Sequence, residues 1–157
     1  MKRKTYLLII IAFLGIFLSS CKKDKEVAPT DQRDQWIGTY VGETNGSITL
    51  TMVGQTTTRP LNGQLNFEIK KGDRINEILM IDDSATLRGI INGSSVTFDP
   101  MTTVQVQDGL SIHLIINSTG TLSGTVFSSE MIITGQGEYL GLIFPIEGMA
   151  TTIATKQ

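Results

Sequence analysis

The stretch that decides the fold is VQVQDGLSIHLII, residues 104–116. Apolar residues fill alternate positions on both sides of Asp108-Gly109, and Gln105 and His113 stand between them. A period of two predicts a β-strand with one packed side and one solvent-facing side. An Asp-Gly pair favours a tight hairpin, because both positions tolerate a positive φ. The stretch therefore predicts two antiparallel strands joined by a short turn.

The same alternation recurs along the chain after Gly38, in windows that begin at residues 48, 65, 87 and 96. Further turn signals lie between or near these windows, at Asn45-Gly46, Asn62-Gly63, Lys71-Gly72-Asp73, Asn92-Gly93 and Ser118-Thr119-Gly120. Closely spaced turns join neighbouring strands, which predicts an all-β, antiparallel up-and-down meander of about 8–10 strands. Closure into a β-barrel removes the two free edges. A β-sandwich is the alternative, because residues 78–81 and 131–133 are apolar on both sides.

Residues 1–20 have the three parts of a secretory signal peptide. Three basic residues at positions 2–4 precede an uncharged apolar run over residues 5–18. This run is shorter than the ~20 residues that span a bilayer, which disfavours a permanent transmembrane helix. The segment therefore predicts an exported protein.

Leu18-Ser19-Ser20-Cys21 resembles the lipobox of bacterial lipoprotein precursors. The resemblance implies cleavage between Ser20 and Cys21, lipidation of Cys21 and a membrane anchor. An exported protein that is cut at the same place but not lipidated is the alternative. A lone cysteine has no disulfide partner, which favours the lipidated form.

The predicted domain organisation has three parts. Residues 1–20 are the signal peptide, residues 21–34 are a lipidated cysteine and a polar tether, and residues 35–157 are the folded domain. The lysines and acidic residues at 22–26 resemble the export signal of Bacteroidetes lipoproteins. That resemblance implies the cell outer membrane, with display at the surface.

Charge and composition exclude several function classes. The full chain has 13 basic and 15 acidic residues, and loss of the three basic residues of the signal leaves 10 minus 15, or −5. Nucleic acid is not an expected partner, because phosphate binding needs a basic surface. Cys21 is the only cysteine and His113 the only histidine, so we expect no thiolate or multi-histidine metal site and no cofactor.

We predict no catalytic residue and a protein that is not an enzyme. His113 lies between Ile112 and Leu114, on the side of the strand opposite to them, which predicts a solvent-facing residue. Asp83-Ser84-Ala85 resembles the short O-glycosylation pattern of Bacteroidetes, which makes Ser84 a candidate site. A simple turn after a strand is the alternative.

Residues 34–40, DQWIGTY, resemble the segment that leads into the first strand of lipocalin-like proteins. In those proteins a helical turn precedes glycine, any residue and an aromatic that plugs the closed end of the barrel. The layout of the whole chain resembles small Bacteroidetes lipoproteins of the lipocalin-like, calycin type. The resemblance implies a lipocalin-like barrel with Trp36, Gly38 and Tyr40 at the plug.

The sequence leaves the function of the other aromatic residues open. They either fill the barrel core or line a ligand cavity: Phe67, Phe98, Phe127, Tyr139 and Phe144. We expect a membrane-anchored, non-enzymatic binding module for a small apolar or neutral ligand or a glycan. The alternative is a surface interaction or inhibitor protein that acts through its outer wall, around residues 78–81.

Overall fold

The computed structural model describes residues 31–157, which form one compact unit. This unit begins four residues before the predicted boundary at residue 35. The predicted signal peptide, the cleavage site at Ser20 and the lipidation site at Cys21 lie outside the described residues. No helix in residues 31–157 has the length and hydropathy needed to cross a membrane.

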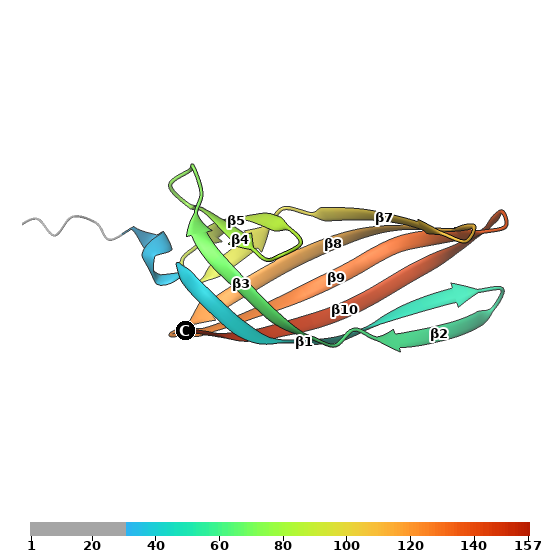
Figure 1. Ribbon diagram of the computed structural model, residues 1–157, viewed down its shortest axis with the longest axis horizontal. Helices are drawn as coiled ribbons and strands as arrows, with labels where there is room; N and C mark the ends of the chain where they lie inside the picture. The colour runs from blue at the N-terminus through green and yellow to red at the C-terminus, as the bar shows by residue number, and fades with distance from the viewer. Residues whose placement is uncertain (1–30) are drawn as a thin grey trace, which may run out of the picture. The chain divides into compact units, whose positions relative to one another are not determined.

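The unit contains one short 3-10 helix followed by ten strands (Figure 1). The elements are η1 (Gln32–Gln35), β1 (Gly38–Met52), β2 (Gln55–Pro60), β3 (Gly63–Lys71), β4 (Glu77–Ile81), β5 (Thr86–Asn92), β6 (Ser95–Phe98), β7 (Met101–Gln107), β8 (Leu110–Ser123), β9 (Val126–Tyr139) and β10 (Leu142–Lys156).

Eight of the strands close into an antiparallel barrel. Neighbours follow the order β10-β9-β8-β6-β5-β4-β3-β1, and β10 also pairs with β1, from Tyr40↔Lys156 to Leu50↔Ile146. The meander and the closure confirm the predicted β-barrel, in place of the alternative sandwich. The architecture fits a calycin-like barrel.

The barrel is closed around its full circumference only near one end, which we call the closed end. Strands β1, β8, β9 and β10 have 14 or 15 residues, whereas β3 to β6 have between 4 and 9. Beyond β3 to β6 the long strands continue, with β2 paired to β1 and β7 paired to β8. This part, which we call the open half, is a sheet in the order β7-β8-β9-β10-β1-β2 (Figure 1).

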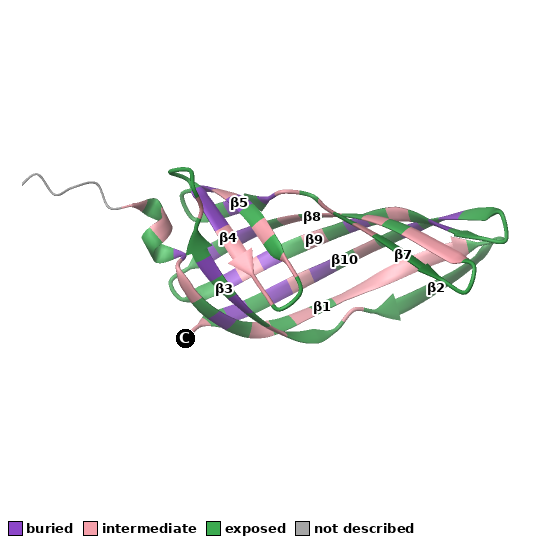
Figure 2. Cartoon of the chain, turned by 45° about the horizontal axis from the view of Figure 1, so that its top comes forward, coloured by how far each residue is buried: buried purple, intermediate pink, exposed green. Residues whose placement is uncertain are grey.

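The packed core lies at the closed end. Trp36, Tyr40, Phe67, Phe98 and Phe127 are all buried there. Tyr40 stacks on Phe67 with ring centroids 5.2 Å apart, and Phe127 meets four other rings edge-on. Buried positions alternate with exposed ones along the long strands, as a sheet with one inward face requires (Figure 2).

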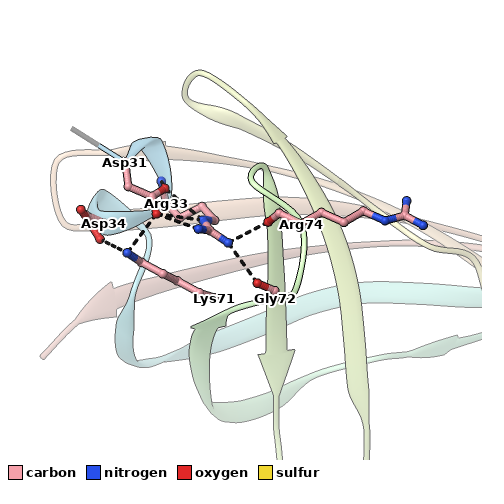
Figure 3. Close-up of polar contacts among 6 residues, drawn as sticks. All are labelled: Asp31, Arg33, Asp34, Lys71, Gly72 and Arg74. Carbon is pink, nitrogen blue, oxygen red and sulfur yellow. Dashed lines mark hydrogen bonds and ion pairs between the residues drawn. The ribbon is translucent and has the colours of Figure 1, made fainter. Parts of the chain in front are cut away.

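Helix η1 is fastened to the closed end by polar contacts (Figure 3). Asp31 caps the helix by accepting a hydrogen bond from the Arg33 backbone N–H. The Arg33 guanidinium donates to the carbonyl oxygens of Gly72 and Arg74, at 3.0 and 2.7 Å. Lys71 lies 3.0 Å from Asp31 and 2.6 Å from Asp34. The hydrogen bond from Arg33, and then that from Lys71, hold the pKa of Asp31 well below its usual range.

Two predicted turns are wrong. Asn45-Gly46 lies inside β1 and Ser118-Thr119-Gly120 lies inside β8. Gly46 and Gly120 allow neighbouring groups to pack closely, and they do not form turns. A Cβ at Gly46 would collide with the backbone of β10 at Ala150, and a Cβ at Gly120 would lie 2.8 Å from Cε2 of Phe127.

Three hairpin turns close the far end of the open half. Asp108-Gly109, which the sequence predicted, joins β7 to β8, whereas Val53-Gly54 and Leu140-Gly141 carry no turn signal. Val53 and Leu140 have φ values of 50° and 51°. Apolar side chains are rare in this left-handed region, and a β-branched one is an outlier.

Candidate binding groove in the open half

A groove of about 530 Å³ lies between β2 and the β7–β8 hairpin, in the described part of the chain. Its apolar lining comes from four strands of the open half: Leu50 and Met52 on β1, Leu110 on β8, Tyr139 on β9 and Phe144 on β10. Its polar lining comes from the two sides: Gln55, Thr57 and Arg59 on β2, with Gln107 and Asp108 opposite. The groove is therefore apolar with polar sides, as small-molecule sites commonly are.

The alternation of the strands places these side chains on the inner face. Leu50 is paired with Thr57 on one side and Ile146 on the other, and residues that face each other across strands share a face. Phe144 is opposite Gly137, where a Cβ would collide with its ring. A glycine is thus needed for Phe144 to lie flat over β9.

Two smaller hollows continue along the inner face toward the closed end. One has a volume of about 350 Å³ and is lined by Ile48, Leu114 and Ile133 among others. The other, of about 160 Å³, reaches Phe98 and Phe127 at the core. The two share Thr44, Ile116 and Met131. The inner face is thus filled at the closed end and hollow beyond it.

The groove lining carries no net charge. Its two charged residues are Arg59 and Asp108, of opposite sign on opposite sides. Within residues 31–157 the Arg59 side chain has no ion pair or hydrogen bond, whereas Arg33, Lys71 and Arg88 each have an acidic partner. Arg59 can therefore turn toward a polar group of a bound molecule.

The structure separates the five aromatic residues that the sequence left open. Phe67, Phe98 and Phe127 are part of the packed core. Tyr139 and Phe144 line the groove, with Tyr139 exposed and Phe144 buried. Three of the five aromatic residues thus fill the core, and the other two line the groove.

The predicted plug residues Trp36, Gly38 and Tyr40 lie together at the closed end. The Tyr40 hydroxyl donates to the Trp36 carbonyl oxygen at 2.8 Å, and burial raises the pKa of Tyr40. The Lys156 ammonium donates to the Gln35 carbonyl oxygen at 3.2 Å, and its side chain passes over Gly38. The Trp36 indole N–H is buried with no hydrogen-bond partner in the described residues.

Two other residues from the sequence analysis lie on the surface. His113 is exposed on the outer face of β8, with its Nε2 3.2 Å from the Ser111 hydroxyl and no acidic side chain bonded to it in residues 31–157. Ser84 is exposed in the β4–β5 turn, where its N–H and hydroxyl both donate to Asp82. Residues 31–157 contain no group of three potential metal ligands close enough to hold an ion.

Four lining residues of the groove were not predicted from the sequence: Leu50, Met52, Arg59 and Leu110. The signal was present in part, because Leu50, Met52 and Leu110 belong to alternating windows. The sequence did not show how far β3 to β6 extend over the inner face. Of residues 78–81, Ile78 is fully buried and the other three are half-buried. Large exposed apolar residues are also present on the open half, including Val104, Val106, Ile143 and Met149.

No protein-family model matches the sequence, and no curated protein matches it. Among solved structures, the chain is similar to the ywiB protein from Bacillus subtilis, at 10% identity and a TM-score of 0.30. The similarity covers 76% of this chain and 92% of that one. At this TM-score the likeness adds nothing to the barrel described above.

Proposed function

We propose that this protein is a lipid-anchored, non-enzymatic binding protein of the bacterial cell envelope that holds a small, mainly apolar and neutral molecule. The groove in the open half is the observation that carries the proposal. Its volume lies within the range of about 300–1,000 Å³ that is usual for small-molecule sites. Its concave, apolar floor offers burial to a ligand that water solvates poorly.

The chemistry of the lining favours a neutral ligand. Arg59 and Asp108 balance each other, so an anion gains from one and is repelled by the other. Gln55, Thr57 and Gln107 offer both donors and acceptors along the sides. A molecule with an apolar body and a few hydroxyl or amide groups fits this pattern, and a sugar ring that stacks on Tyr139 is one such molecule.

The proposed anchor rests on Leu18-Ser19-Ser20-Cys21. Two or more fatty chains hold a protein stably at a membrane, because each buried methylene contributes about 0.8 kcal/mol. We place the mature protein at the outer membrane on the basis of the residues after Cys21. Intact mass of protein from its own host tests this: wild type should carry acyl chains, and Cys21→Ala should lack them. An unmodified wild-type mass would refute the anchor.

Fluorescence of N-phenyl-1-naphthylamine, a neutral apolar probe, tests the groove. Leu110→Gln places an amide on the groove floor, and Ile115→Gln makes the same kind of change on the outer face of the same strand. We expect Leu110→Gln to weaken probe binding at least fivefold and Ile115→Gln to leave it unchanged. Equal binding by both variants, or no binding by wild type, would refute the proposed site.

A further inference from the structure

Strand β7 has an unpaired edge along the open half. Its residues pair with β8 on one side, from Met101↔Ile116 to Gln107↔Leu110, and with no strand on the other within residues 31–157. Alternate backbone N–H and C=O groups of a free strand point outward and can pair with another strand. This edge is therefore a template for strand addition.

The β7 edge lacks the features that usually prevent such pairing. Its sequence MTTVQVQ has no charge and no proline, and four of its seven residues are β-branched. Val104 and Val106 are 53% and 73% exposed on the outer face. The other free edge, β2, ends in Arg59-Pro60, and charged residues and proline on an edge strand oppose pairing. One edge of the sheet is thus protected and the other is not.

The β7 edge is complementary to itself. An antiparallel pair of β7 strands with a two-fold axis at Val104 aligns all seven residues of one copy with the seven of the other. Val104 then lies opposite Val104 of the second copy. Thr102 then meets Val106 on the outer face, and Thr103 meets Gln105 on the inner face. β-branched residues favour strands, and the Val104–Val104 and Thr102–Val106 pairs each consist of two of them. A charged residue on β7 would lie close to the same charge on the second copy and would be repelled by it. β7 has no charged residue, so this repulsion does not arise.

We propose that β7 pairs with β7 of a second copy of this chain, antiparallel and centred on Val104. The two open halves then share one continuous sheet, with both grooves on its inner faces. An edge contact of seven residues is smaller than the roughly 1,200 Å² of a stable interface. The dimer is therefore weak, and it forms where copies are concentrated.

Disulfide cross-linking in cells that express the full chain tests the register. Directly opposed residues of antiparallel strands have Cα atoms about 4.5–5.5 Å apart, within reach of a disulfide. We expect Val104→Cys to give a dimer on a non-reducing gel after oxidation with copper phenanthroline. Thr102→Cys alone should not, because the two copies of that residue are about 13 Å apart along the strand. Co-expression of Thr102→Cys with Val106→Cys should restore the dimer.

Two controls make this result specific. The parent chain has Cys21 as its only cysteine and gives the background. Thr58→Cys places a cysteine at an exposed position of the β2 edge and should stay at that background. A Val104→Cys dimer no stronger than the Thr102→Cys or Thr58→Cys product would overturn the proposal, as would a cross-link to a different protein.

Charge variants provide an independent test that needs no new cysteine. Two differently tagged copies should co-purify when both are wild type. We expect the amount of co-purified partner to fall at least tenfold when both copies carry Val104→Lys, or when both carry Val104→Glu. Co-purification should recover when one copy carries Val104→Lys and the other Val104→Glu. Thr58→Lys in both copies should leave co-purification unchanged. Failure of the opposite charges to recover it, with both variants folded by circular dichroism, would contradict pairing at Val104.

Discussion

Phe127 on β9 connects the aromatic core, and we expect Phe127→Ala to be among the most destabilising substitutions in the barrel. Its ring centroid lies 5.4 Å from Phe67, 6.0 Å from Tyr40, 6.4 Å from Trp36 and 6.5 Å from Phe98. The side chain is only 1% exposed. Truncation to alanine removes one side of four ring contacts at once.

The expected loss follows from burial and from the cavity left behind. Removing a buried aromatic ring costs about 2–3 kcal/mol of transfer free energy, and the cavity brings a Phe→Ala change to about 3–5 kcal/mol. We expect the upper half of this range, because the neighbouring rings belong to strands held in a closed barrel. With about 3–5 °C per kcal/mol for a domain of this size, the melting temperature should fall by roughly 12–25 °C.

Urea unfolding followed by far-UV circular dichroism measures this loss, and the emission of Trp36 reports on the same core. Ile132→Ala is the matched control, because Ile132 lies on the outer face of β9 and is 52% exposed. We expect it to change the free energy of unfolding by less than about 1 kcal/mol. A loss below 1 kcal/mol for Phe127→Ala, or equal losses for the two variants, would refute the assignment of the core.

Three further substitutions give distinct outcomes. Gly120→Ala should destabilise by about 1–3 kcal/mol, because the new methyl group meets the Phe127 ring, and a smaller loss in the Phe127→Leu background would show this contact directly in a double-mutant cycle. Val53→Asn should raise stability by about 0.5–1 kcal/mol in thermal unfolding, because asparagine tolerates the φ of 50°; lower stability would contradict strain at this turn. Asp31→Asn should lower stability at pH 7 and make the stability depend less on pH, because Arg33 and then Lys71 depress the pKa of Asp31 below its ordinary value of 3.8. The Asp31 carboxylate therefore stabilises the fold fully above pH 3.8, and this stabilisation is lost as the pH falls through the depressed pKa. Urea midpoints between pH 2 and 7 measure this, and parallel curves for wild type and variant would contradict it.

Most of the strands could be predicted from the sequence because they have one packed face, and a period of two is visible in the residues themselves. The alternation at 104–116 appears as β7, Asp108-Gly109 and the first half of β8. The packed side predicted for β7 is wrong, because Val104 and Val106 are exposed on the outer face, opposite His113 and Ser111. Asn45-Gly46 was wrongly predicted as a turn, because the sequence does not distinguish a glycine that allows a neighbouring strand to pack closely from a glycine that forms a turn. Val53-Gly54 and Leu140-Gly141 were missed because the first residue of each turn contradicts turn propensity.

The groove could not be predicted in the same way, because it depends on unequal strand lengths. Phe67 and Phe144 both stand at inward positions of alternating strands, yet one is in the core and the other beside a hollow. The difference is that β3 to β6 cover the first and end before the second. Arg59 was likewise unremarkable in the sequence, since only the pairing of β2 with β1 turns it inward.

Both ends of the described chain meet at the same pole of the barrel. Helix η1 caps that pole, and the backbone N–H of Gln157 donates to the Thr39 carbonyl oxygen beside it. The three hairpins Val53-Gly54, Asp108-Gly109 and Leu140-Gly141 lie at the opposite pole (Figure 1). The candidate groove, beside these hairpins, therefore lies far from both ends of the described chain. A fluorescent label attached at Asp31 or at Gln157 would report on the barrel without obstructing the groove.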